Sequence, residues 1–158
     1  MESIIKKINS NKFLFSVFII SVLSFSACKV TFVPKYDGKI AEQIELVSKS
    51  VDKLYLTMLE TTTEADGGRA YDKFAEQYID IDIELHSLLN KNKARKGNEE
   101  TIRICESVIE MFDKYKNNHK NNNTISDAII KLNLVYLRGI LYPLAVAEEA
   151  KKMSENNK

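Results

Sequence analysis

Proline and glycine are scarce in this chain, and their scarcity bears directly on its fold. Two prolines and five glycines occur among 158 residues. Strands joined by tight turns need such residues at short intervals. The composition therefore argues against a fold of many short strands and predicts long helices.

Histidine and the common catalytic motifs are also scarce. The two histidines are His86 and His119, and neither has a glutamate three residues before it, as the Glu-x-x-His motifs of di-iron helical bundles require. The chain also lacks Cys-x-x-Cys, Gly-x-Ser-x-Gly and phosphate-loop motifs. We therefore predict no catalytic site, no metal site and no cofactor. An enzyme assembled from scattered carboxylates and tyrosines is the alternative that the sequence leaves open.

No sign of charge predominates. The chain has 23 basic and 22 acidic residues. Proteins that bind nucleic acid present a broad basic surface. The balance of charge therefore predicts no nucleic-acid partner.

The first 28 residues, by contrast, carry a clear pattern. Three lysines precede an uncharged stretch over residues 13–25, and two small residues then lead to Cys28. A basic start, an apolar stretch of about 7–15 residues and small residues at a cleavage site are the order of an export signal. A permanent membrane span needs about 20 apolar residues, so this stretch is too short to favour one.

Residues 23–28, Leu-Ser-Phe-Ser-Ala-Cys, resemble the lipobox of bacterial lipoproteins, although Phe25 stands where Leu, Val or Ile is more usual. The resemblance covers the signal alone. It implies removal of residues 1–27, a diacylglycerol on the Cys28 thiol and acylation of the new amino terminus. Several acyl chains hold a protein stably at a membrane, because each buried methylene contributes about 0.8 kcal/mol.

The same resemblance implies a place in the cell. It locates the protein in the bacterial envelope, and Lys29, rather than an aspartate, after the cysteine favours the outer membrane over the inner. An ordinary signal peptide or an uncleaved anchor, with Cys28 incidental, is the alternative.

Lipid on Cys28 would leave Cys105 without a partner in the same chain. Cys105 shares helical spacing with Ile102, Ile109 and Phe112, which predicts a buried core residue. A reactive thiol or a disulfide between chains is the alternative.

Four helices are predicted after a short tether over residues 28–36. Apolar residues recur at alternating steps of three and four, which is the spacing of one helix face. The predicted helices span about 37–64, 69–94, 98–116 and 124–153, and a disordered tail is expected over 154–158. Short connections favour antiparallel neighbours, so we expect an all-α, up-down-up-down antiparallel four-helix bundle.

Individual residues suggest where these helices begin and end. Asp37 and Asn98 are expected N-caps, Thr124 with Asp127 resembles a capping box, and Gly97 is a natural stop. The polar run over 117–123 is expected to be a loop that contains His119. Residues 79–85 alternate as a strand would, but the helical spacing continues on both sides.

An acidic stripe follows one face of the second predicted helix. Glu76, Asp80 and Glu84 are four residues apart, and Asp82 is adjacent. Like charges at this spacing destabilise an isolated helix by about 0.2–0.5 kcal/mol per pair. The stripe is interpreted as a surface for a basic partner, a weak cation site, or a solvated face paired with Arg103 or another cation across the bundle.

The fourth predicted helix has too little charge for an ordinary outer helix. Residues 132–147 contain one charge, and apolar side chains occur all around the helix, which is typical of burial on more than one side. Either the helix is unusually covered, or its outer face meets a second copy, another envelope protein or the membrane surface. The candidate interaction residues here are Leu134, Arg138, Leu141 and Tyr142.

Pro143 suggests a second role for this helix. Proline lacks an N–H group and crowds the carbonyl of Gly139, so a kink is expected. A gap opened at the kink, lined by Tyr136 and Tyr142, would suit a small apolar ligand.

These patterns together predict a non-enzymatic binding or accessory protein held in the envelope by lipid on Cys28. A carrier of a small apolar ligand between Gly139 and Pro143 is the alternative.

Overall fold

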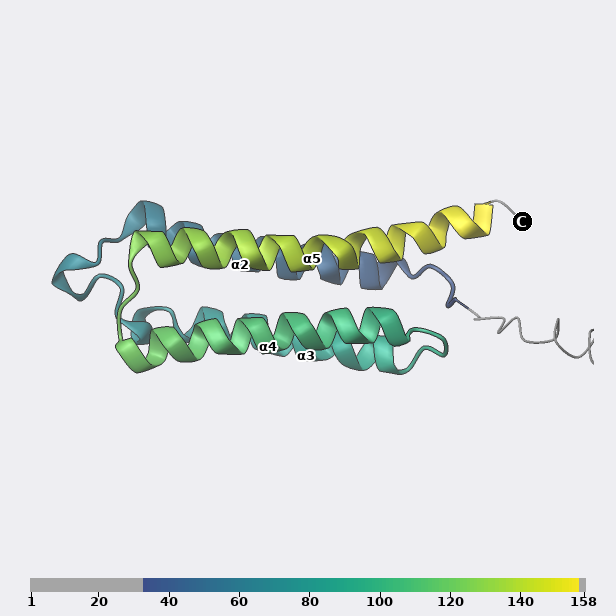
Figure 1. Ribbon diagram of the computed structural model, residues 1–158, viewed down its shortest axis with the longest axis horizontal. Helices are drawn as coiled ribbons and strands as arrows, with labels where there is room; N and C mark the ends of the chain where they lie inside the picture. The colour runs from purple at the N-terminus through teal and green to yellow at the C-terminus, as the bar shows by residue number, and fades with distance from the viewer. Residues whose placement is uncertain (1–32, 157–158) are drawn as a thin grey trace, which may run out of the picture. The chain divides into compact units, whose positions relative to one another are not determined.

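The computed structural model describes residues 33–156, which form four long helices (Figure 1). The elements are α2 (Gly38–Thr61), the 3-10 turns η2 (Ala65–Gly67) and η3 (Tyr71–Lys73), α3 (Ala75–Lys93), α4 (Glu99–Asn122) and α5 (Asp127–Asn156). No strand occurs within the described range. The signal and Cys28 lie outside it.

The four helices close into a bundle. Each packs against its neighbours along the chain, and α5 also packs against α2. Successive helices run in opposite directions (Figure 1). The predicted all-α, up-down-up-down antiparallel bundle is confirmed.

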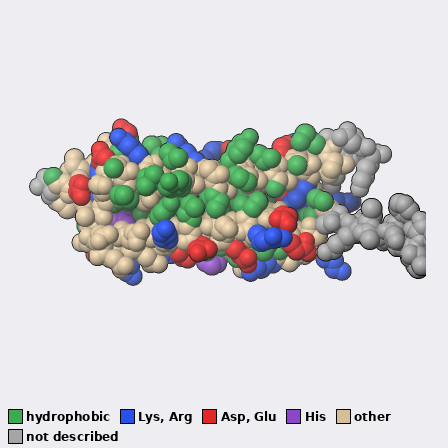
Figure 2. Space-filling model, viewed as in Figure 1, with side chains coloured by type: hydrophobic (Ala, Val, Ile, Leu, Met, Phe, Trp, Pro, Cys, Tyr) green, Lys and Arg blue, Asp and Glu red, His purple; other side chains and the backbone are tan. Residues whose placement is uncertain are grey.

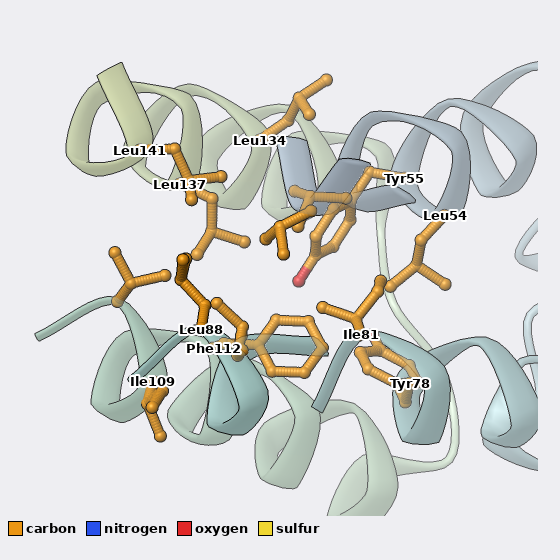
Figure 3. Packing of buried hydrophobic residues seen from close by; sticks show 14 of the residues in the cluster. Leu54, Tyr55, Tyr78, Ile81, Leu88, Ile109, Phe112, Leu134, Leu137 and Leu141 are labelled. Atoms are coloured by element: carbon orange, nitrogen blue, oxygen red, sulfur yellow. The ribbon is translucent and has the colours of Figure 1, made fainter. Parts of the chain in front are cut away.

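The core is made from the faces that the helical spacing predicts. The α2 residues Ile40, Ile44, Val47, Val51, Leu54 and Met58 are all buried. Aromatic rings fill the middle, where Tyr55, Tyr78 and Phe112 pack with Leu137 of α5 (Figure 3). Cys105 is also in the core, and burial raises its thiol pKa to about 11. The prediction of a core cysteine is confirmed.

The alternating segment within α3 is helical. Ile81 and Leu85 are buried, whereas Ile79 and Ile83 are exposed. A strand would place all four on one face, so the packing of α3 overrides the local alternation.

The connection from α2 to α3 is longer than predicted, because Arg69 binds backbone carbonyls in the protein interior and does not begin a helix. Its buried guanidinium donates hydrogen bonds to the carbonyls of Met58 (3.2 Å), Thr62 (3.0 Å) and Ile125 (3.1 Å). The first two bonds satisfy carbonyls at the C-terminal end of α2, and the third joins this end to the α4–α5 connection. Residues 62–74 therefore form turns around Arg69, and α3 begins at Ala75 rather than near residue 69.

The prediction of a loop over 117–123 is wrong. Helix α4 continues to Asn122 and ends where Asn123 adopts a left-handed conformation (φ 49°). His119 is 2 % exposed and bonds to the Tyr78 hydroxyl at 3.0 Å, so the core continues along this turn. The exposed asparagines cost the helix little, because tertiary packing provides most of its stability.

Three further end predictions need correction. Helix α5 begins at Asp127, so Thr124 is not at its N-cap position and the predicted capping box with Asp127 does not form. Asn98 stands at the N-cap position of α4 but makes no side-chain cap bond; its amide bonds to Asn92 and Lys151 instead. Helix α5 continues to Asn156, into the segment expected to be a disordered tail.

The Tyr55 hydroxyl provides a test of the core. It is buried and points toward Phe112 and Ile81, and it makes no well-aligned hydrogen bond with its polar neighbours Tyr78 and Asn133 (Figure 3). Replacing Tyr55 by Phe should leave the free energy of unfolding unchanged or raise it by about 1 kcal/mol, because a buried hydroxyl without a well-aligned hydrogen bond is costly. Leu137→Ala, the matched core truncation, should lower it by about 2–5 kcal/mol. Urea denaturation measures both; a loss in the Tyr55→Phe variant would show that the hydroxyl is bonded.

Candidate interaction surface

Helix α5 has two apolar faces, and the bundle covers one of them. The inner face consists of Ile130, Leu134, Leu137, Leu141 and Leu144, all buried. Leu134 and Leu141 were predicted as interaction residues. Since they are 6 % and 3 % exposed, they belong to the core.

The opposite face is open. Leu132, Val135, Gly139, Tyr142 and Val146 follow one another at steps of three, four, three and four, and we call this row the outer seam. All five residues are exposed, Val135 by 63 % and Tyr142 by 71 %. Figure 2 shows hydrophobic side chains gathered on the face formed by α5 and α4, with charges mainly at its borders. Such a surface is larger than scattered exposed side chains produce, and it indicates an interaction site.

Helix α4 widens this surface on one side. Met111, Tyr115 and Ile140 line a hollow of about 290 Å³ between α4 and α5, with polar residues at its edge. Tyr136 is half exposed on the same side. The apolar surface therefore extends from the outer seam onto α4.

The α2 side of the outer seam is charged. Arg138 donates to both carboxylate oxygens of Asp52, at 2.8 and 3.0 Å. Of the predicted interaction residues on α5, Arg138 and Tyr142 thus lie at the surface. The ion pair forms a polar border.

Helix α5 also has the length and composition of a membrane span. Among the described helices, Asp127–Ser154 is the one segment that meets this criterion. Its inner face packs against α2 and α4, and a core helix with a second apolar face meets the same criterion.

A buried carboxylate holds the far end of α5 in place. Glu148 is 1 % exposed and accepts hydrogen bonds from Arg95 (3.1 Å to each oxygen), Lys151 (2.7 Å) and the Asp37 backbone N–H (2.8 Å). Burial alone would raise its pKa, but these donors outweigh burial and lower it below the ordinary value. Glu148 therefore stays ionised inside the protein.

The same cluster joins the end of α5 to two other segments. Lys151 donates to Asn98 (2.9 Å), at the start of α4, and Arg95 also donates to the carbonyl of Lys35. The start of α2, the α3–α4 connection and the end of α5 are therefore fixed to one another. This arrangement sets both the orientation of the outer seam and the point where the tether joins the bundle.

The acidic stripe is only partly paired. Glu84 accepts a hydrogen bond from Gln43 at 2.9 Å, whereas Glu76 and Asp80 are exposed and make no ion pair within residues 33–156. Arg103 pairs with Glu100 rather than with the stripe. Across the described part of the chain, no group of three potential ligands is placed to hold a metal. The stripe is therefore a largely solvated face.

The proposed ligand gap at Pro143 is not supported. Helix α5 continues through Pro143, and Tyr136 and Tyr142 are 52 % and 71 % exposed. A Cβ added at Gly139 would meet no atom within 4 Å. The two tyrosines therefore lie on an outer surface and do not line an enclosed pocket.

His119 occupies a buried position that sequence reasoning missed. Its Nδ1 accepts from the Tyr78 hydroxyl at 3.0 Å, and its Nε2 donates to the Arg69 carbonyl at 2.8 Å. Burial lowers its pKa although the bond to Arg69 acts in the opposite direction, so the ring is neutral at pH 7. Both ring nitrogens are used in structural hydrogen bonds.

Two further hollows lie on the surface. One, of about 350 Å³, is lined by polar residues near the α4–α5 connection, including Asn118, Asn122 and Asn133. The other, of about 540 Å³, is lined by residues 82–91 of α3 alone, so no second element encloses it.

Comparisons with known proteins give no match. No protein-family model matches the chain, and neither a curated protein nor a solved structure is significantly similar to it. The surface and the N-terminal pattern therefore carry the functional inference.

The outer seam itself was visible in the sequence but was not separated from the core face. Its signal is a second row of residues at steps of three and four, offset by half a turn from the inner row. The Glu148 cluster had no such signal, because its members lie far apart in the chain.

The Glu148 cluster can be tested by removing its charge. Glu148→Gln should lower the free energy of unfolding by about 3–5 kcal/mol, because Arg95 and Lys151 lose their buried counter-ion. Glu149→Gln, the neighbouring exposed change, should alter it by less than about 0.5 kcal/mol. Urea denaturation of both variants makes the comparison, and equal effects would contradict a structural role for Glu148.

The contribution of Glu148 to the free energy of unfolding should also depend on pH. The pKa of Glu148 is lower in the folded protein than its ordinary 4.5, so its contribution to stability is fully present above pH 4.5. It is lost as the pH falls through the lower folded pKa. The Glu148→Gln variant should therefore lose less stability on acidification than the wild type.

Proposed function

We propose that this protein is a lipid-anchored protein of the bacterial envelope whose bundle binds another polypeptide through the outer face of α5. The observation that carries the binding role is the exposed outer seam. Water contact with such a face is unfavourable, and a partner helix or sheet that covers it would remove that cost.

The N-terminal pattern supports the anchor. The basic start, the apolar stretch over 13–25 and the small residues before Cys28 form an export signal with an acylation site. Cys28 is nine residues before Asp37, a distance of at most about 30 Å. A bundle tethered this closely stays beside the membrane, and Lys29 favours the outer membrane.

The polar interior supports binding over catalysis. Glu148, the most buried carboxylate among the described residues, is held by two cations, and His119 uses both ring nitrogens in structural bonds. A general acid or base needs an open position toward a substrate. These groups have none.

The anchor can be tested by metabolic labelling. When cells that express the full chain are grown with labelled palmitate, the protein should become labelled. The Cys28→Ala substitution should abolish this labelling. Cys105→Ala is the matched control, since Cys105 is buried and should not be acylated. Label retained in the Cys28→Ala variant would overturn the anchor.

The binding surface can be tested by photocrosslinking in intact cells. A photoreactive residue at Tyr142 of the outer seam should give a discrete adduct with a polypeptide. The same residue at Ile83, which is 60 % exposed on α3, should not. Equal adducts at both positions, or none at Tyr142, would contradict a specific role for α5.

A further inference from the structure

The spacing of the outer seam indicates the kind of partner that fits it. Steps of three and four are the spacing of the a and d positions of a coiled coil, which pack into the side chains of a facing helix. The inner face of α5 has the same spacing and packs inside the bundle. The outer seam therefore fits a helix of similar pattern.

We propose that this helix is α5 of a second copy of the chain, paired antiparallel about Gly139. The inference rests on the proposed function, since it takes the outer face of α5 to be a binding surface. It names the occupant of that surface.

Gly139 provides the first argument. A glycine inside a helix costs about 0.5–1 kcal/mol relative to alanine. The bundle gives no steric reason for it, because a Cβ at this position would meet no atom within 4 Å. A second helix that approaches closely at Gly139 provides one, since small residues allow backbones to approach.

The seam is also symmetric about this glycine. Leu132 lies seven residues before Gly139, and Val146 lies seven after it. In an antiparallel pair centred on Gly139, Leu132 of each copy faces Val146 of the other. Val135 and Tyr142 fill the levels between, so apolar residues meet apolar residues along the whole seam.

Charge decides the direction of pairing. The α2 flank of the seam carries three charged residues, Lys131, Arg138 and Glu149. Arg138 is seven residues after Lys131 and Glu149 is eleven after Arg138, so the three lie within about 20° of one another around the helix axis. An antiparallel pair brings like flanks together, and Lys131 of each copy then lies within one turn of Glu149 of the other. The two Arg138 side chains also meet near the centre, where each keeps its ion pair with Asp52 of its own copy.

The α4 flank agrees with this direction. Ile129, Tyr136 and Ile140 lie on it, so like flanks bring apolar residues together as well. A parallel pair would place the charged flank of one copy against the apolar flank of its partner, which is unfavourable.

The pairing also has a consequence for two anchored copies. The Asp37 N–H donates a hydrogen bond to Glu148, so the start of α2 lies beside Glu148. Glu148 is nine residues after Gly139 in α5, which is about 14 Å along the helix axis. The two tethers therefore leave the pair about 27 Å apart along the helix axis. Both reach one membrane when α5 lies along the membrane surface.

Cysteine crosslinking tests the pairing in the full-length, membrane-held chain. Leu132→Cys and Val146→Cys chains expressed together should form a disulfide-linked dimer on mild oxidation. Either variant expressed alone should not, because identical positions lie about 21 Å apart in this arrangement. The wild-type chain, whose Cys105 is buried, is the background control.

Charge reversal provides the matched control for specificity. Lys131→Glu or Glu149→Lys, introduced into both chains, should lower the yield of the mixed dimer by about threefold to tenfold, and the double reversal should restore it. Circular dichroism checks that each variant keeps its fold. Since both residues are exposed, loss of the fold is not expected.

The outcomes separate this inference from the proposed function. A Leu132→Cys chain that crosslinks with itself would show parallel pairing and overturn the proposal, as would the absence of any mixed dimer. If no mixed dimer forms while Tyr142 still crosslinks to a different polypeptide, the α5 surface stands and self-pairing fails. If Tyr142 crosslinks to nothing, both fail.

Discussion

The buried charge of Glu148 is the interaction on which the arrangement of this bundle depends most. A carboxylate that is 1 % exposed can stay ionised because Arg95, Lys151 and the Asp37 N–H surround it. Those donors come from three separate parts of the chain. Satisfying one charge therefore fixes the start of α2, the α3–α4 connection and the end of α5 together.

This constraint reaches the proposed binding surface through the rotation of α5. Once Glu148 and the inner leucines face inward, the outer seam must face outward, because its residues lie half a turn away. These residues are Leu132, Val135, Gly139, Tyr142 and Val146. The outer seam is thus a consequence of packing the inner one. A helix with two apolar rows cannot bury both inside a bundle of four, which leaves one row exposed.

Much of the fold could be predicted from the sequence, and the errors have identifiable physical causes. The α2 core face follows from local spacing and was predicted correctly. Leu134 and Leu141 were assigned to the surface because a helix that is apolar all round gives no sign of which row faces inward. The run over 117–122 was expected to be a loop because asparagine favours loops, whereas the buried bonds of His119 keep it helical.

The sequence by itself determined the four helices, their antiparallel order and most of their inner faces, and it carries the N-terminal pattern ending at Cys28 from which export is proposed. Each of these depends on residues close together in the chain, where spacing and composition are sufficient. Only the tertiary structure decided which row of α5 remains exposed, why residues 69–74 are not part of α3, and which cations compensate the charge of Glu148. Those outcomes depend on side chains from distant segments meeting in a low-dielectric interior, where an unpaired polar group is too costly to leave unsatisfied.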